Sequence, residues 1–359
     1  SVLTILIRLY QRGICKLVIN GFVIIAVIMS FQFLRIFRKQ RIMAAQSQTW
    51  ISDNKTYRYI LSKKPTELVI NFHMTETCNY SCNYCYATWE ASCGAKELHR
   101  TEGAIEALID NLADHFLSDN TLRQTMNYQT VRLNFAGGEP MVLGKRFSDA
   151  LLYAKSKGFR TSIITNGAFL DQQRLVELSP HIDVLGVSFD TADEIIAGSI
   201  GRMDRKGSWI SADRLATISS EYKRLNPSGL FKVNTVVNQF NHHESLVDVM
   251  TIVSPDKWKL LRVLPVYDHI KPVSDSEFES YTERHSMFSH INVVEDNSDM
   301  AASYLMINPN GCFYQNGELQ NGYEISEPIL QVGVAKAFDQ IDFNTDTFFS
   351  RYDVDVVNM

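Results

Sequence analysis

The chain has 359 residues, of which 45% are hydrophobic, and this length fits one large domain or two ordinary ones. The formal net charge is −5, whereas general nucleic-acid binding favours a basic surface, so direct nucleic-acid binding is not expected. Six cysteines are too sparse for a disulfide scaffold, and we therefore expect a folded domain that works in the reducing cytoplasm.

An uncharged apolar stretch lies near the start of the chain, at residues 17–34, and basic residues flank it on both sides. Its length is near the minimum for a membrane span, and the basic run after it would keep the rest of the protein in the cytoplasm. Met43 offers another start, in which case residues 1–42 are upstream sequence and not an anchor. Both interpretations stay open. Residues 43–66 would then link this segment to the first domain.

Short β-rich runs alternate with segments of helical periodicity from residue 67 onward. Strands are expected at residues 68–73, 131–135, 161–165, 184–189, 232–237 and 260–266. Helices are expected between them at residues 101–117, 146–157, 171–178, 212–224 and 244–252. About six βα units predict an α/β fold with a parallel sheet and helices outside it. Because the strand signal fades after Pro265, we expect a partial six-unit (β/α) barrel over residues 67–270 and a C-terminal extension over residues 271–359.

Polar residues recur at the carboxyl ends of the expected strands, where barrels of this kind gather their active site. We expect one mouth to be lined by the cysteine loop, a Gly-Gly-Glu-Pro run at residues 137–140, Asn166, Ser188, Asp190 and Asn234.

Three cysteines, Cys78, Cys82 and Cys85, follow the first expected strand with C-x3-C-x2-C spacing. A four-iron cluster needs one thiolate per iron, so three thiolates leave one iron able to bind a small molecule. Cys93 lies eight residues further on and could complete a tetrahedral zinc site instead, although zinc motifs usually pair their ligands as C-x2-C. The spacing therefore favours an iron–sulfur cluster, with zinc as the alternative.

Several motifs in one order carry a resemblance to a known family. They are CNYSCNYCYATWEAS, LNFAGGEPMV, SIITNGAFL, GVSFDTAD, IGR, KVNTVVNQFN and DKWKLLRVLP, and the likeness covers about residues 67–351. The cysteine spacing followed by Gly-Gly-Glu-Pro resembles the radical S-adenosylmethionine superfamily, and the ordered set resembles its viperin family. This resemblance implies conversion of a ribonucleoside triphosphate to its 3′-deoxy-3′,4′-didehydro form by 4′-hydrogen abstraction and loss of water. The product terminates chains made by viral polymerases. Animal viperins use CTP and homologues elsewhere also use GTP or UTP, so the base stays open.

The resemblance implies two cofactors, a [4Fe-4S] cluster and S-adenosyl-L-methionine. Cys78, Cys82 and Cys85 would hold three irons, and the open iron would chelate the amino and carboxylate groups of S-adenosylmethionine. The implied cofactor-binding residues are Tyr84, Gly137, Gly138, Glu139, Asn166, Ser188 and Arg202. In this set the glycines allow close backbone approach and Glu139 accepts from the methionyl ammonium. An electron donor such as a flavodoxin or ferredoxin is also implied.

The implied substrate site consists of cations and amides that suit a triphosphate. Its residues are Asn71, Arg132, Lys232, Asn234, Lys257, Lys259 and Arg351. Lys257 stands where viperins have an arginine, and Arg132 where they have a lysine. Tyr304 matches a tyrosine near the substrate and is the candidate catalytic residue for delivering the final hydrogen. The C-terminal extension would close over the nucleotide.

The chain departs from the viperin pattern at two places. Ala136 precedes Gly-Gly-Glu-Pro where viperins have a serine, and residues 316–327 contain no Lys or Arg where viperins have a lysine-rich stretch. Two alternative functions are a radical enzyme for another small-molecule or peptide substrate and a membrane-associated antiviral scaffold. Only Cys312 follows Cys93, whereas peptide-modifying radical enzymes usually bring cysteines for auxiliary clusters. The ordered cofactor motifs argue against the scaffold.

Overall fold

The computed structural model describes residues 48–53, 56–62, 67–87, 96–265, 271–300, 302–315, 323–350 and 354–358. Two compact units are present, one formed by Ser1–Lys63 with Asp353–Met359 and the other by Lys64–Tyr352. The first contains an antiparallel sheet in the order β1 (Gln48–Asp53), β2 (Thr56–Ser62) and β13 (Val354–Asn358). The possible membrane segment at residues 17–34, Cys93 and Arg351 lie outside the described residues. Within the described part of the chain, no helix is long and apolar enough to cross a membrane.

The second unit is built on a ten-stranded sheet in the order β12-β11-β10-β3-β4-β5-β6-β7-β8-β9. The strands from β10 across to β9 all run parallel, while β11 and β12 add antiparallel at one edge. Their bounds are β3 (Glu67–His73), β4 (Thr130–Ala136), β5 (Arg160–Thr165), β6 (Val184–Ser188), β7 (Leu230–Val237), β8 (Lys257–Arg262), β9 (Asn292–Glu295), β10 (Leu305–Ile307), β11 (Cys312–Gln315) and β12 (Glu324–Pro328). The predicted α/β fold with a parallel sheet that is not closed is confirmed.

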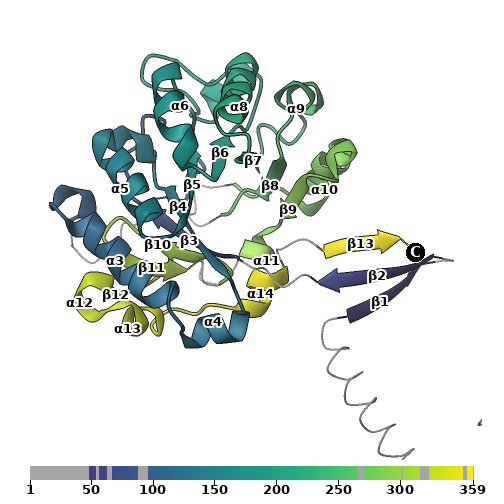
Figure 1. Cartoon of the computed structure of the whole chain (residues 1–359). Helices are drawn as coiled ribbons and strands as arrows, with labels where there is room; N and C mark the ends of the chain where they lie inside the picture. The colour runs from purple at the N-terminus through teal and green to yellow at the C-terminus, as the bar shows by residue number, and fades with distance from the viewer. Residues whose placement is uncertain are drawn as a thin grey trace, which may run out of the picture. The chain divides into compact units, whose positions relative to one another are not determined.

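Helices connect the parallel strands and lie around the outside of the curved sheet (Figure 1). The longer ones are α3 (Ala104–Phe116), α5 (Lys145–Ser156), α6 (Gln172–Leu178), α8 (Ala212–Leu225), α9 (Val247–Val253) and α10 (Asp275–Arg284). Shorter α-helical segments are α4 (Thr121–Met126), α7 (Glu194–Ser199), α11 (Asn297–Met300), α12 (Ile329–Val332), α13 (Val334–Phe338) and α14 (Thr345–Ser350). Single 3-10 turns are η1 (Leu98–Arg100), η2 (Pro140–Leu143), η3 (Ser179–His181) and η4 (Ser286–Phe288).

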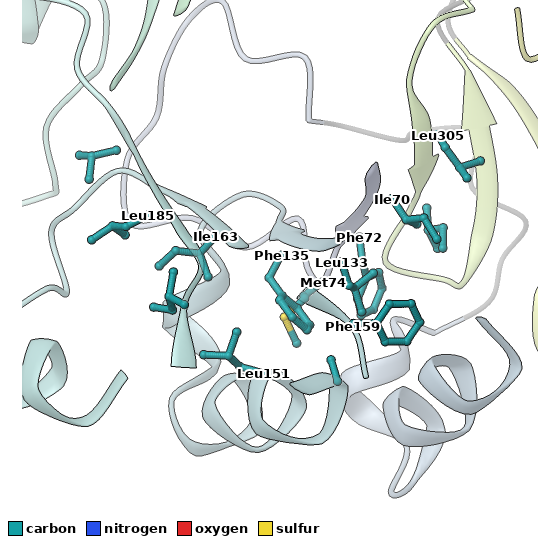
Figure 2. Packing of buried hydrophobic residues seen from close by; sticks show 14 of the residues in the cluster. Ile70, Phe72, Met74, Leu133, Phe135, Leu151, Phe159, Ile163, Leu185 and Leu305 are labelled. Atoms are coloured by element: carbon teal, nitrogen blue, oxygen red, sulfur yellow. The ribbon is translucent and has the colours of Figure 1, made fainter. Parts of the chain in front are cut away.

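The two faces of the parallel sheet differ in polarity because side chains alternate along each strand. One face carries fully buried apolar residues such as Ile70, Phe72, Leu133 and Phe135, which pack with Leu151 of α5 in the main core (Figure 2). The residues between them are polar and lie on the inner face of the sheet. This pattern leaves the inner face available for a polar ligand.

The structure corrects the expected elements at several points. Strand β8 begins at Lys257 and ends at Arg262, whereas the sequence predicted residues 260–266. The predicted helix over residues 244–252 begins later, as α9 at Val247. Strands β9 and β10 were missed, because segments of four and three residues give too short an alternation to recognise. Both come from the expected C-terminal extension, yet they join the parallel sheet at its two sides.

Candidate functional site

The cysteine loop, defined here as residues 74–87, leaves the carboxyl end of β3 and presents Cys78, Cys82 and Cys85 as half-buried thiols. Its centre is tied to the segment after α7 by backbone hydrogen bonds from Ser81 N to Gly201 O and from Asn83 N to Ile200 O, both 3.1 Å long. Gly201 has φ +74°, and a Cβ atom there would lie 2.1 Å from Ser81 O. A side chain cannot be accommodated at Gly201 unless the cysteine loop moves.

The Gly-Gly-Glu-Pro run packs its backbone directly against the start of the cysteine loop. Gly138 N donates to Thr75 O at 2.7 Å, and Glu139 N donates to Thr77 O at 3.0 Å. A Cβ at Gly138 would stand 2.5 Å from the carbonyl oxygens of residues 76 and 77. The close approach expected of the glycines is therefore present, and its visible partner is the backbone of the cysteine loop.

Glu139 is a buried carboxylate at the junction of β4, β5 and the cysteine loop. It accepts hydrogen bonds from Met141 N at 3.1 Å, Thr165 Oγ1 at 2.8 Å and Asn166 N at 2.7 Å. Burial raises its pKa to about 6 even though these three donors oppose the shift. A cationic ligand beside this carboxylate would be stabilised, because the charge of Arg202 is the smallest of the effects that offset the burial of Glu139.

Asp190, just beyond β6, joins three parts of the site through a side chain that is only 1% exposed. It accepts hydrogen bonds from the Tyr84 hydroxyl and from Val236 N at 2.7 Å, and it forms an ion pair with Arg202 Nε at 3.2 Å. Arg202 also donates to Ser188 O, and its Nη1 lies 4.0 Å from Cys82 Sγ. Asp190 thus fixes the expected cofactor residues Tyr84 and Arg202 beside the cysteine loop.

Asn166, at the end of β5, also reaches the cysteine loop. Its Nδ2 donates to Asn79 Oδ1 at 2.7 Å and lies 3.8 Å from Cys78 Sγ. All of the expected cofactor residues therefore come together around one loop at the carboxyl ends of β3–β6.

The expected phosphate-binding cations lie deeper on the inner face of the sheet. Lys232 stands beside Lys257 in the β7–β8 register, and Asn234 stands beside both Ser188 and Lys259. Burial, and then the charges of Lys259 and Arg132, hold the pKa of Lys232 well below its usual range; Glu295 opposes this shift, and Lys257 adds a smaller lowering. The side chains of Lys232, Lys257, Lys259 and Arg132 therefore lie near one another in one interior region, which also holds Glu295.

A line of polar side chains crosses the inner face from β3 to β5. Asn134 Nδ2 donates to Asn71 Oδ1 at 2.8 Å, and Ser162 Oγ donates to Asn134 Oδ1 at 2.6 Å. Arg132 donates to Ser162 Oγ at 2.8 Å and pairs with Glu67 at 2.7 Å. Arg132 and Asn71 are thus already held in place by their neighbours.

Tyr304 forms hydrogen bonds with two charged residues, Lys259 of β8 and Glu295 of β9. Lys259 Nζ donates to the Tyr304 hydroxyl at 2.5 Å and pairs with Glu295 Oε1 at 2.6 Å. The Tyr304 hydroxyl in turn donates to Glu295 Oε2. Tyr304, Lys259 and Glu295, called here the Tyr304 triad, form one closed hydrogen-bonded group.

Comparison with known proteins identifies the family. A model of the Radical SAM superfamily matches residues 72–219. A protein named S-adenosylmethionine-dependent nucleotide dehydratase from Pseudoalteromonas ulvae is 54% identical over 286 residues, which cover 80% of this chain and 93% of that protein. A protein of the same name from Psychrobacter lutiphocae is 37% identical over an alignment that covers 80% of this chain and 95% of that protein. The chain belongs to the S-adenosylmethionine-dependent nucleotide dehydratases.

The fold of this dehydratase agrees with that assignment. The solved structure of native anSMEcpe with bound AdoMet superposes with a TM-score of 0.54 at 14% identity, covering 79% of this chain and 82% of that one. That likeness concerns the fold alone. The predicted resemblance to the viperin family is confirmed by the named relatives, and neither alternative function is favoured by them.

A radical SAM dehydratase uses a [4Fe-4S] cluster and S-adenosylmethionine, and the residues of this chain fit both. Cys78, Cys82 and Cys85 present three thiols on one tethered loop, the donor set of a cluster with one open iron. Burial raises the pKa of Cys78 to about 11, so cluster assembly there must displace thiol protons. Among described residues, no three His, Cys, Asp or Glu side chains gather around a single ion position. The zinc alternative needs Cys93, which lies outside them.

Sequence reasoning missed residues whose roles depend on partners far along the chain. Asp190 was expected to line the mouth but was given no role, since its hydrogen bond with Tyr84 and its ion pair with Arg202 join positions 106 and 12 residues apart. Glu295 was not predicted, because no strand was expected around it and an isolated acidic residue usually lies at the protein surface. Its pairing with Lys259 follows only from the β8–β9 register in the structure.

Proposed function

We propose that this enzyme converts a ribonucleoside triphosphate, with CTP, GTP or UTP as the candidates, into its 3′-deoxy-3′,4′-didehydro form. The nucleotide class follows from the relatives named nucleotide dehydratases. The triphosphate and the position of attack follow from the resemblance to viperins. The product would act as a chain terminator for viral polymerases.

The observation that carries this proposal is the convergence of cations on the inner face. The charges of Lys259, Arg132 and Lys257 act on Lys232, and although Arg132 pairs with Glu67 and Lys259 pairs with Glu295, these four cations outnumber the two carboxylates. Grouping positive charges in a half-buried site costs free energy unless an anion binds there. A triphosphate carries several negative charges and accepts hydrogen bonds from Arg and Lys, so it matches this site in charge and chemistry.

The cofactor and substrate regions share one interior. Ser188, an expected cofactor residue, stands beside Asn234 in the parallel register, and Asn234 stands beside Lys259. When bound, the cluster and S-adenosylmethionine supply the 5′-deoxyadenosyl radical that removes hydrogen. Cys78, Cys82 and Cys85 would hold the cluster, while Glu139 would accept the methionyl ammonium and Arg202 would contact the cofactor carboxylate or ribose. Tyr84, Gly137, Gly138 and Asn166 would shape this end of the site.

The reaction requires two electrons and one proton for each nucleotide. One electron would be used in cleaving the bound S-adenosylmethionine. After the nucleotide has lost its 4′ hydrogen, the second electron and the proton would be used as its 3′ hydroxyl is lost as water. A flavodoxin or ferredoxin would supply the electrons, and Tyr304 would take part in delivering the final hydrogen equivalent. Arg351, outside the described residues, would bind phosphate as the C-terminal extension closes.

The test is anaerobic incubation of reconstituted protein with a reductant, S-adenosylmethionine and each of CTP, GTP and UTP. Mass detection should show 5′-deoxyadenosine together with a nucleotide lighter by one water. Lys232→Met should need far more nucleotide for the same yield, while Glu279→Gln on the exposed side of α10 should behave as wild type. If no nucleotide loses water although the cluster is intact, the proposed substrate class is wrong.

A further inference from the structure

The Tyr304 triad lies where the open barrel fails to close, between β9 and β10, a place called here the seam. Strands β9 and β10 follow one another in the chain, yet β9 pairs with β8 and β10 pairs with β3, on opposite sides of the parallel sheet. The link between them passes through α11 (Figure 1). No backbone ladder joins β9 to β10 in the described sheet. Side chains make the connection instead, since the Tyr304 hydroxyl, one residue before β10, donates to Glu295 at the end of β9.

Glu295 contacts both other members of this group, one a cation and the other a hydroxyl donor. Its side chain is 3% exposed, and its two oxygens are divided between Lys259 Nζ and the Tyr304 hydroxyl. Lys259 Nζ in turn donates to the same hydroxyl and lies 5.0 Å from the centre of the Tyr304 ring. The phenolic proton and the phenolic oxygen are thus both oriented, so the hydroxyl has one defined direction in the interior.

We propose that Glu295 is a positioning residue for the dehydration, which orients the Tyr304 hydroxyl and the Lys259 ammonium toward the reacting nucleotide. This inference rests on the proposed function. Glu295 does not touch the phosphates in this role, because a carboxylate repels them. Its charge serves to hold Lys259 among the neighbouring cations and to keep Tyr304 at the seam.

The role has a kinetic consequence that a phosphate ligand or a purely structural residue would not share. Hydrogen abstraction from the nucleotide comes first, and the proton and second electron for water loss must then arrive promptly. A misdirected Tyr304 would leave hydrogen abstraction intact and would slow the loss of water that follows it. Radicals would then be lost to side reactions, so 5′-deoxyadenosine would form without the matching dehydrated nucleotide.

The test compares Glu295→Gln, Tyr304→Phe and the double variant in fully reconstituted protein. Because glutamine has nearly the same shape as glutamate, the fold and iron content should be unchanged. Turnover to dehydrated nucleotide should fall about tenfold to a hundredfold, as expected for a mispositioned group, with KM unchanged or lower. The ratio of 5′-deoxyadenosine to product should rise severalfold in both single variants, and the double variant should resemble either one.

A matched control is Glu244→Gln, which changes another partly buried carboxylate that accepts a backbone hydrogen bond, from Ala192 N at 2.7 Å. It should keep the wild-type ratio. The proposal is overturned if Glu295→Gln keeps the wild-type ratio and turnover, if its only effect is a raised KM, or if the two single effects multiply in the double variant. Failure of the wild-type protein to dehydrate any nucleotide would instead refute the proposed function.

Discussion

Gly201→Ala tests how the fold holds the cysteine loop. The substitution puts a Cβ atom 2.1 Å from Ser81 O and 3.1 Å from Cys82 Cα, at a backbone φ of +74°. The left-handed conformation costs an alanine about 1–2 kcal/mol. Relief of the overlap must move the loop, which breaks the bonds from Ser81 N to Gly201 O and from Asn83 N to Ile200 O, each worth about 0.5–1.5 kcal/mol.

Together these terms disfavour the ordered cysteine loop by roughly 2–5 kcal/mol, or about thirtyfold or more in its population. The strands and their core are untouched, so far-UV circular dichroism should stay close to wild type. Iron and acid-labile sulfide per chain, measured after anaerobic reconstitution, should fall sharply. The matched control is Gly198→Ala, also at the end of α7, where a Cβ meets only the Met203 side chain at 3.7 Å. Full cluster loading in Gly201→Ala would refute this account of the loop.

Three further predictions concern charge. Burial raises the pKa of Glu139 from 4.5 to about 6, so the folded protein binds a proton more tightly than the unfolded chain, and this contribution to stability is lost as pH rises from 4.5 through 6. In urea unfolding of the cluster-free protein, Glu139→Gln should remove a decline of about 2 kcal/mol over that interval, and an unchanged slope would contradict this. Because burial and the neighbouring cations lower the pKa of Lys232, a bound triphosphate should raise it again, so nucleotide affinity should fall as pH rises, and Lys232→Met should weaken that dependence. Identical pH profiles of nucleotide affinity in wild type and Lys232→Met would count against a role for this charge. Arg351→Ala should raise the KM for the nucleotide about tenfold or more while cluster content stays unchanged. Unaltered nucleotide binding would remove Arg351 from the site.

Local features of the sequence predicted much of the fold and the cofactor end of the site. The cysteine motif and the Gly-Gly-Glu-Pro run are each a short continuous stretch of sequence that can be recognised locally. The alternation of apolar and polar residues in β3 and β4 marks which side chains face the core. The expected strands appear as β3–β8. Strand β8 begins three residues earlier than predicted, so that it includes Lys257 and Lys259.

The remaining features depend on contacts that no local pattern encodes. Short strands such as β9 and β10 become strands only because the edges of a parallel sheet are available to pair with them. Glu295 gains its partners only once β9 lies beside β8 and Tyr304 returns to the seam. Asp190 likewise contacts Arg202 and Tyr84 only after the chain has folded.

The central claim is that the enzyme removes the 4′ hydrogen of a ribonucleoside triphosphate, and isotope transfer tests it most directly. Reconstituted protein is incubated anaerobically with S-adenosylmethionine and the preferred nucleotide, deuterated at the 4′ position. The account predicts one deuterium in 5′-deoxyadenosine for each nucleotide that loses water. Deuterium retained in the nucleotide product, or transfer only from nucleotide deuterated at another ribose position, would contradict it.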